Sequence, residues 1–326
     1  AVSGGIGGAS AAERAEIHVA VAARAISAIP LLTAKAKGYF TDEGLDVRFD
    51  YFGSGPAAVA SLLGGSSQFL YGALVDNIKA VHRGQPLVVT MAGLGEVTVA
   101  LVIRKDLASK LGRTPTVKDL KGLRIGTLGR GGFIDLATRY TLKINGIDPE
   151  KEATLIPIRG GDRQIMAGKA GEVDANMLSD PWPVLAVEKL DEWRYVVNFT
   201  MGEGPELFRH FGFSMLQTSK PYVGRNRPIV EKMVRATIRA QNFIGDPKNL
   251  DVLVQIALRE FPDYDPVVLR RTMEISAKAY RPQVAASMIE KNTELLRATD
   301  QVSGPMPSYD DIVDKSFQPL WKAYRH

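Results

Sequence analysis

The chain has 326 residues, of which 45% are hydrophobic and 24% are charged, which suits a globular protein with two packed lobes and excludes the fibrous and disordered classes. Its formal net charge is +5, yet the basic residues are scattered in short groups such as Arg104-Lys105 and Arg270-Arg271, which favours a mildly basic surface over a nucleic-acid-binding stripe. The sequence has no cysteine, which excludes disulfides, thiolate metal sites and cysteine nucleophiles.

The N-terminal segment 1–15 is rich in small residues, and Ala9-Ser10-Ala11 has the small-x-small form that signal peptidase accepts. We therefore expect 1–15 to be the remnant of an export signal or a flexible leader. The mature protein is then expected in the periplasm.

Strand and helix signals alternate regularly over the first hundred residues. Alternating apolar residues predict strands, and apolar residues at helical spacing between glycine or proline boundaries predict helices. The predicted strands are 17–21, 45–51, 68–71 and 87–91, and the predicted helices are 30–38, 56–64 and 75–82. This order is the βαβ pattern of a doubly wound, mostly parallel sheet.

A second series of the same kind follows the capping box Thr116-Val117-Lys118-Asp119. Its predicted strands are 123–127, 154–158, 173–178 and 195–198, with a glycine-rich loop at 128–132, a helix at 133–144 and a helix opened by Pro181.

From Pro228 onward the pattern is helical, and a tail without a sheet of its own must bury its apolar faces on an existing lobe. We expect the first lobe to be that partner. The predicted lobes are 16–103 plus 214–326, and 104–213. The chain then crosses between them near Arg104 and near Phe213, and paired crossings form a hinge.

Several short motifs appear in a characteristic order. They are Ala34-Lys35-Ala36-Lys37-Gly38-Tyr39-Phe40, Glu43-Gly44-Leu45-Asp46-Val47, Phe52-Gly53-Ser54-Gly55, Asp119-Leu120-Lys121-Gly122-Leu123-Arg124-Ile125-Gly126, Gly171-Glu172-Val173-Asp174-Ala175 and Asp180-Pro181. Over residues 17–220 the chain thereby resembles the solute-binding proteins of nitrate, sulfonate and taurine importers, the NMT1/THI5-like family, some of which bind pyrimidine precursors of thiamine. The resemblance implies an α/β, two-lobed type II periplasmic-binding-protein fold with ligand in the cleft between lobes.

The same resemblance implies binding rather than chemistry, in a monomer that delivers a small molecule to the permease of an ABC importer. Enzymes related to these binders, pyrimidine synthases and a desulfinase, depend on cysteine, which this chain lacks. The four histidines show no metal-ligand spacing and no phosphate-loop motif is present, so we expect neither a metal nor a cofactor. A receptor that reports to a signalling partner remains an alternative.

Ligands of open α/β sheets lie beyond the carboxyl ends of the strands, which makes the loops there the candidate site. In the first lobe these loops contain Arg24, Ala25, Ile26 and Ser27, then Ser54 and Gly55, then Tyr71, Gly72 and Ala73. Arg24 either supplies charge to a ligand or is a solvated loop residue. Ser54 either helps to form an anion-binding helix start or only caps its helix, and Tyr71 either offers a ring face or ends a buried strand.

In the second lobe the candidates are Arg130, Gly131, Gly132 and Phe133, then Ser179, Asp180 and Trp182, with Phe213 at the second crossing. An arginine and glycines before a helix suit an anion, and Arg130 is expected to hold a carboxylate or sulfonate-like group. Sulfonate binders of the family carry hydroxyl residues in this loop, which disfavours sulfonate itself.

Three of these candidates have structural alternatives. Asp180 either accepts hydrogen bonds from a ligand or caps the next helix, Trp182 either stacks on a planar ligand or packs in the core, and Phe213 either touches ligand or packs the hinge. The expected ligand is a small organic anion, with a pyrimidine or thiamine precursor, or an enzyme of the same fold acting on such a ligand, as the alternative.

Overall fold

A computed structural model describes residues 14–22 and 24–326. The leader expected at 1–15 lies almost wholly outside the described residues, although Ala15 already begins the first strand, β1.

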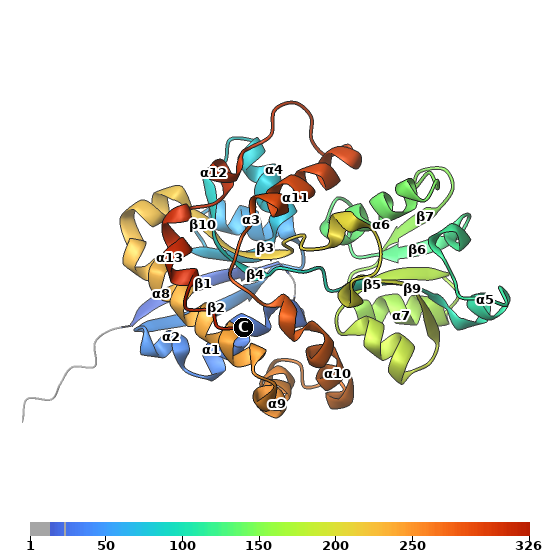
Figure 1. The fold of residues 1–326 in the computed structure, drawn as a ribbon, viewed down its shortest axis with the longest axis horizontal. Helices are drawn as coiled ribbons and strands as arrows, with labels where there is room; N and C mark the ends of the chain where they lie inside the picture. Colours follow the sequence, from blue (N-terminus) through green and yellow to red (C-terminus); the bar gives the residue numbers. More distant parts are fainter. Residues whose placement is uncertain (1–13, 23) are drawn as a thin grey trace, which may run out of the picture.

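Two five-stranded sheets form the two lobes seen at the left and right of Figure 1. The first has the order β2-β1-β3-β10-β4, with β1 (Ala15–Val21), β2 (Leu45–Tyr51), β3 (Phe69–Ala73), β4 (Leu87–Leu94) and β10 (Ser214–Ser219). The second has the order β7-β6-β8-β5-β9, with β5 (Val99–Arg104), β6 (Arg124–Thr127), β7 (Thr154–Pro157), β8 (Ala175–Ser179) and β9 (Trp193–Asn198). In each sheet one strand, β10 or β5, runs antiparallel to both of its neighbours, and the pairs β1–β2, β1–β3, β6–β7 and β6–β8 are parallel. The predicted α/β fold with two mostly parallel sheets is confirmed.

The first crossing lies earlier than expected. Strand β5 pairs with β8 in the second sheet, in a register that places Val99 opposite Ser179. The chain therefore changes lobes at residues 95–98, and the expectation of a crossing near Arg104 is wrong by one strand. Residues 99–103 are all buried, because both faces of β5 are covered, so the segment shows no alternation that would have identified it as a strand of the second sheet.

The second crossing leads into β10, as expected near Phe213, and it lies beside the first. The N–H of Gly212 donates to the carbonyl of Gly95 at 2.8 Å, and the N–H of Phe213 donates to the carbonyl of Leu94 at 2.9 Å.

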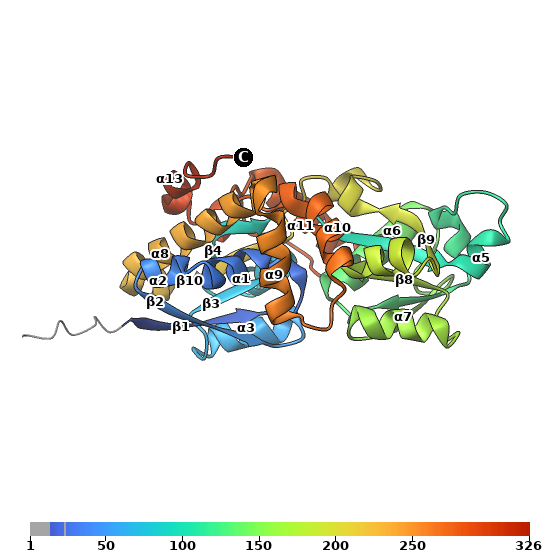
Figure 2. The ribbon, with the colours of Figure 1, turned by 90° about the horizontal axis from the view of Figure 1, so that it is seen from below.

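Helices cover both faces of each sheet (Figure 2). The first lobe has η1 (Ile26–Ala28), α1 (Ile29–Ala36), α2 (Tyr39–Asp42), α3 (Gly55–Leu63) and α4 (Leu74–His82), and the second has α5 (Lys105–Ser109), η2 (Val117–Leu120), α6 (Phe133–Ile144), α7 (Gly161–Lys169), the π-helix η3 (Val184–Lys189), η4 (Phe199–Met201) and η5 (Glu206–Phe208). In β5, Leu101 packs in the same cluster as Leu136 of α6, whereas Val102 packs with Ile165 of α7. Alternate residues of one strand thus anchor helices on opposite faces.

The tail contains α8 (Lys220–Gly245), η6 (Pro247–Asn249), α9 (Leu250–Glu260), α10 (Pro266–Ser276), η7 (Ala277–Ala279), α11 (Ala286–Ala298), α12 (Tyr309–Ile312), η8 (Lys315–Phe317) and α13 (Gln318–Trp321). Helix α8 packs on α1 and β4, which confirms the expected attachment to the first lobe. Two tail helices also contact the second lobe. Helix α10 meets η3 through the ion pair Arg271–Glu188 at 3.0 Å, and α11 meets α6 where the hydroxyl of Tyr140 donates to Glu294 at 3.1 Å.

Candidate ligand site at the seam between the lobes

Five residues from four segments of the chain form what we call the seam cluster: Ile26, Ser27, Tyr71, Asp180 and Tyr280. The hydroxyl of Tyr71 donates to the carbonyl of Ser27 at 3.1 Å, and the hydroxyl of Tyr280 donates to the carbonyl of Ile26 at 3.4 Å. Burial raises the pKa of both tyrosines, and the nearby charge of Asp180 raises that of Tyr280 further. The loops after β1 and β8, strand β3 and the end of η7 therefore come together where the two lobes touch.

Asp180 is the polar residue of this cluster that comes from the second lobe. It is 3% exposed, and neither of its carboxyl oxygens has a hydrogen-bond partner among the described residues. Burial raises its pKa to about 8. The alternative that Asp180 caps the following helix is wrong, because a capping carboxylate would accept a backbone N–H.

Trp182 contacts the tail rather than lying only in the core. Its ring lies edge-on to Tyr264 at 5.1 Å between centroids, and Tyr264 stacks on Phe261 at 4.9 Å. The guanidinium of Arg24 lies 5.4 Å from the centre of the Phe261 ring. The connection between α9 and α10 thus joins Arg24 of the first lobe to Trp182 of the second.

Arg24 is held in place while much of its side chain stays in solvent. Its Nε lies 3.5 Å from Glu260 Oε1, and its Nη2 donates to the carbonyl of Glu260. The hydroxyl of Tyr51 donates to the same carboxylate at 3.0 Å. Because 55% of the Arg24 side chain is exposed, its cationic face remains accessible to a ligand.

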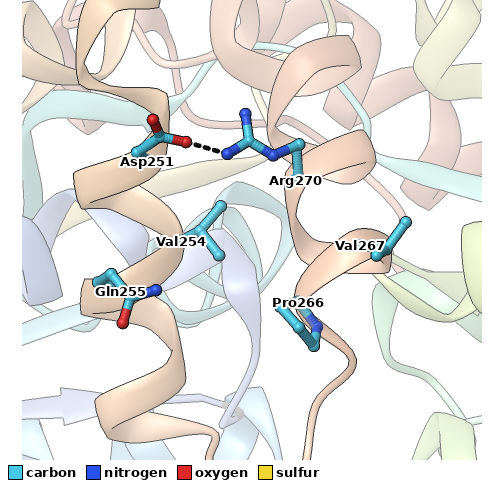
Figure 3. A pocket seen from close by; sticks show the side chains of 6 residues that line it. All are labelled: Asp251, Val254, Gln255, Pro266, Val267 and Arg270. Carbon is cyan, nitrogen blue, oxygen red and sulfur yellow. Dashed lines mark hydrogen bonds and ion pairs between the residues drawn. The ribbon is translucent and has the colours of Figure 1, made fainter.

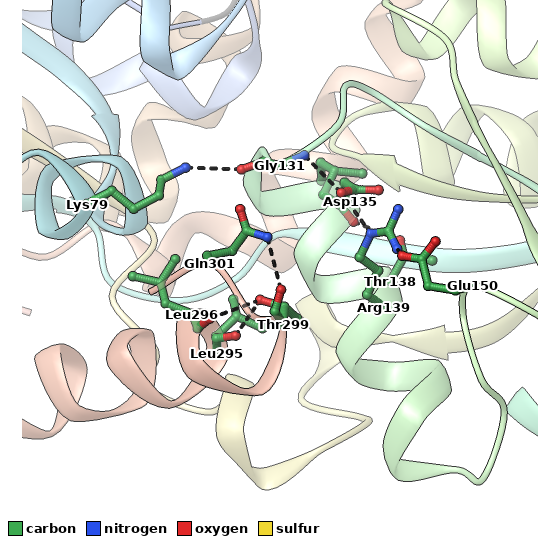
Figure 4. Close-up of polar contacts among 11 residues, drawn as sticks. Lys79, Gly131, Asp135, Thr138, Arg139, Glu150, Leu295, Leu296, Thr299 and Gln301 are labelled. Atoms are coloured by element: carbon green, nitrogen blue, oxygen red, sulfur yellow. Dashed lines mark hydrogen bonds and ion pairs between the residues drawn. The ribbon is translucent and has the colours of Figure 1, made fainter. Parts of the chain in front are cut away.

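The start of α6, where an anion was expected, already holds a carboxylate of the chain (Figure 4). Asp135 Oδ2 accepts the N–H of Gly131 at 2.9 Å and pairs with Arg139 at 3.0 Å. A ligand anion at this helix start would have to compete with Asp135.

The start of α3 is similar. Ser54 caps the helix by accepting the N–H of Ala57 at 3.4 Å, which is the structural alternative considered for this residue. The carboxylate of Asp76 lies so close to Gly55 that a Cβ there would be 1.8 Å from Asp76 Oδ2. Lys79 pairs with Asp76 of the same helix at 2.9 Å, and it also donates to the carbonyl of Gly131 in the second lobe at 3.1 Å, so the lysine of this pair links the two lobes.

Arg130 lies in the loop before α6, as predicted. Its side chain is exposed and lines a surface pocket whose other residues all belong to the second lobe, among them Thr127, Arg139 and Glu150. The neighbouring carbonyl of Gly131 accepts from Lys79 of the first lobe, so the loop of Arg130 lies next to the seam, and the expectation that Arg130 holds a ligand stays a prediction. Arg159, in the loop between β7 and α7, is exposed as well.

Phe133 and Phe213 contact one another across the second crossing, with ring centres 4.6 Å apart. Phe133 also packs against Phe208 and Phe211. This aromatic cluster supports the hinge-packing alternative for Phe213.

The remaining candidates lie at the ends of helices and strands. Ala25, Ala73 and Gly132 immediately precede η1, α4 and α6, the carbonyl of Gly72 accepts from Gln217 at 3.0 Å, and Ser179 is the last residue of β8.

Sequence reasoning missed three tail residues, Glu260, Tyr264 and Tyr280. Each lies at a helix end or close to one. A side chain there does not belong to the apolar face of a helix, so it is free to make other contacts. That placement was the signal available in the sequence.

One further pocket lies between α9 and α10 and has a volume of about 270 Å³ (Figure 3). It is lined by Asp251, Val254, Gln255, Pro266, Val267 and Arg270, all from the tail. It is therefore separate from the seam.

Over residues 14–22 and 24–326 there is no group of histidines and acids suited to a metal ion. Each helix in the same part of the chain is too short or too polar to cross a bilayer.

The chain is similar in sequence to binding proteins of bacteria. YtlA of Bacillus subtilis (strain 168), whose assignment as a binding protein is provisional, is 26% identical over 307 residues, 92% of this chain and 88% of that protein. The nitrate/nitrite binding protein NrtA of Synechococcus elongatus is 30% identical over 131 residues, 40% of this chain and 28% of that protein.

Solved structures show the same fold. The alkanesulfonate-binding protein SsuA of Xanthomonas axonopodis pv. citri, bound to MOPS, has a TM-score of 0.73 at 19% identity and covers 93% of this chain and 99% of its own. The periplasmic nitrate-binding protein NrtA of Synechocystis PCC 6803 has a TM-score of 0.73 at 14% identity, covering 95% of this chain and 88% of its own. These relatives are binding proteins, not enzymes. The model of the NMT1-like family matches residues 10–258, and the chain belongs to that family.

Proposed function

We propose that this chain is the solute-binding receptor of an ABC importer, that it works in the periplasm, and that its lobes close on one small molecule at the seam. The observation that carries the proposal is the position of Tyr280, which donates to Ile26 of the first lobe and lies close enough to Asp180 of the second for that charge to affect it, next to two crossings that lie side by side. Binding proteins of nitrate and alkanesulfonate among the structural relatives support the same role. We propose further that the protein is a monomer and that it delivers its solute to the permease of the importer.

The crossings have the form of a hinge. Gly212 has φ 74°, and a Cβ there would lie 2.8 Å from Met288 Sδ. A Cβ on Gly95 would lie 2.8 Å from Arg281 Nε. Short connections with glycines at their contact let two packed bodies rotate through a few backbone dihedrals, which is how paired crossings act in hinge closure.

For the ligand we propose a small organic acid. Arg24 is the candidate cation that lies beside the seam with an exposed side chain, and it is oriented by Glu260 and Phe261. A planar ligand such as a pyrimidine is the second candidate, because Trp182 and Tyr264 bring aromatic rings from both lobes to the same place.

The test measures binding and closure together. Solute released by denaturing the purified protein is identified by mass spectrometry, then added back to the refolded protein. We expect the melting temperature to rise, because a ligand at one hundred times its Kd stabilises the folded state by about 2.7 kcal/mol. Small-angle scattering is expected to show a smaller radius of gyration. No stabilisation and no compaction, with that solute and with a panel of small acids and pyrimidines, would refute the receptor function.

A further inference from the structure

We propose that the second lobe binds a small oxyanion of the phosphate or sulfate type in a pocket beside the start of α6. The pocket has a volume of about 290 Å³, and Thr127, Arg130, Arg139 and Thr154 are among the residues that line it. This site is additional to the seam, so it goes beyond the receptor function and does not depend on it.

The pocket is formed by the second lobe alone. Its lining comes from the end of β6, from the loop and helix that follow, and from the segment 149–157, which contains β7, the outermost strand of its sheet. Among the described residues, none from the seam cluster, the first lobe or the tail lines it. A solute held between the lobes therefore does not occupy this pocket, and an anion can bind there whether the lobes are open or closed.

Two arginines line the pocket and retain unused N–H donors. Arg139 donates from Nε to Asp135 Oδ2 at 3.0 Å and from Nη1 to Glu150 (Figure 4), and its Nη2 has no acceptor among the described residues. Arg130 is exposed and forms no ion pair within the same part of the chain. A guanidinium presents several N–H groups in one plane, which suits the oxygens of an oxyanion. The pocket therefore offers cationic donors from two residues.

Thr127 adds a buried donor to the same pocket. The residue is 1% exposed, and its hydroxyl has no hydrogen-bond partner among residues 14–22 and 24–326. A buried hydroxyl without a partner is costly to keep, and an oxyanion in the pocket would accept its hydrogen bond. Thr154, the first residue of β7, brings a second hydroxyl to the lining from an exposed position.

The acids of the pocket leave room for one negative charge. Asp135 is 3% exposed and is engaged by the N–H of Gly131 and by Arg139. The side chain of Glu150 is 61% exposed, and it reaches Arg139 from the solvent side. An ion pair with an exposed partner contributes little, so an oxyanion that receives several charge-assisted hydrogen bonds can replace Glu150. With Glu150 turned to solvent, the two arginines face one acid, and the pocket carries one positive charge in excess.

The experiment measures the binding of inorganic phosphate and of sulfate by calorimetry, on the full chain at constant ionic strength. Glu150→Gln removes the competing carboxylate, and we expect it to bind phosphate about 3- to 10-fold more tightly. Thr127→Val keeps the branched shape and removes the buried hydroxyl, and we expect binding about 10-fold weaker. Glu172→Gln, which makes the same change of charge at an exposed acid elsewhere in the second lobe, is the control for Glu150→Gln and should bind like the original protein.

Two results would overturn this inference. One is no binding of phosphate or sulfate at millimolar concentration, either by the original protein or by Glu150→Gln. The other is binding that Glu150→Gln and Thr127→Val leave unchanged and that Arg24→Gln abolishes, because the anion would then lie at the seam. The receptor function is tested with the co-purified solute, so it would stand after either result.

Discussion

His210 and Glu96 join the two crossings that connect the lobes. The N–H of His210 donates to Glu96 Oε2 at 2.7 Å, and His210 Nδ1 lies 2.6 Å from Glu96 Oε1. Arg281, from the tail, donates to the same carboxylate. His210 also has a left-handed backbone with φ 50°, which few residues other than glycine adopt, so this contact holds an unfavourable conformation at the hinge.

Glu96→Gln is expected to loosen this hinge. The substitution removes the charge that holds both His210 and Arg281, and we expect the free energy of unfolding to fall by about 1 kcal/mol. Urea denaturation measures the loss, and small-angle scattering measures the spread of lobe orientations, which should widen. Glu290→Gln, an exposed acid of α11, is the matched control. Identical scattering curves for the two variants would show that the contact does not restrain the hinge.

Two ion pairs of opposite polarity join η3 to the start and middle of α10. Lys189 lies 3.0 Å from Asp265, and Glu188 lies 3.0 Å from Arg271. Both pairs are partly exposed, so each is expected to contribute about 0.2 to 1 kcal/mol. Because these pairs join the tail to the second lobe, we expect them to change the balance between the open and closed forms.

Glu188→Arg is expected to place like charges at this contact and to favour the open form, with a larger radius of gyration. The double variant Glu188→Arg with Arg271→Glu should restore the original radius, because it reverses the pair without removing it. High salt should reduce the difference between the single variant and the original protein. If the double variant stays as open as the single one, these pairs do not hold the lobes together.

Lys79→Met tests the charge pair that reaches the second lobe. The side chains of Lys79 and Asp76 are 12% and 7% exposed, so removing the lysine leaves a buried carboxylate without its cation. We expect a loss of about 3 kcal/mol in the free energy of unfolding. The double variant Lys79→Met with Asp76→Asn removes both charges and should lose less. Urea denaturation measures the free energy of unfolding of both variants. Equal losses in the single and the double variant would show that Lys79 and Asp76 are not energetically coupled.

Much of the fold could be predicted from the sequence because its signals are local. Gly38, for example, has φ 73° and lies between α1 and α2, where a helix-ending glycine was expected. Strand β10, with the sequence Ser-Met-Leu-Gln-Thr-Ser, was missed, since an inserted antiparallel strand has neither strict alternation nor a βαβ context. The seam was only half predictable for a related reason. Ser27 and Asp180 follow strands, and Tyr71 lies within one, so their positions can be predicted from strand signals in the sequence. Tyr280 reaches them only through the packing of the tail.

The charge at the helix starts shows a second limit of sequence reasoning. Glycines before α6 suggest an open anion site, but Asp135 lies one turn later and folds back onto the N–H of Gly131. Competition between a ligand and a neighbouring side chain is decided by three-dimensional distance. The spacing of residues along the chain does not show which one wins.

His18 gives the protein a pH-dependent contribution to stability where β1 pairs with β2 in the first sheet. Its Nδ1 lies 2.8 Å from Asp50 Oδ2, and this hydrogen bond, with the charges of Asp50 and Glu16, raises the pKa of His18 above 6.5. The stabilisation is therefore fully present below pH 6.5 and is lost as the pH rises through the higher pKa of the folded state. Since 36% of the side chain is exposed, we expect only a few tenths of a kcal/mol. The urea midpoint is measured at pH 5.5 and at pH 8 for the original protein and for His18→Gln. We expect the difference between the two midpoints to be smaller in the variant, and an unchanged difference would contradict this role of His18.

Gly161→Ala tests whether the position of Trp182 matters for the seam. A Cβ at residue 161 would lie 2.1 Å from Trp182 Cδ1, so the ring must move away from Tyr264. Overpacking of this kind costs about 1 to 3 kcal/mol. Gly129→Ala is the control, because a Cβ there meets nothing within 4 Å and the backbone is not left-handed. We expect Gly161→Ala to lower both the melting temperature and the affinity for the co-purified solute. A variant that loses stability but keeps its affinity would show that Trp182 packs against the tail without taking part in ligand binding.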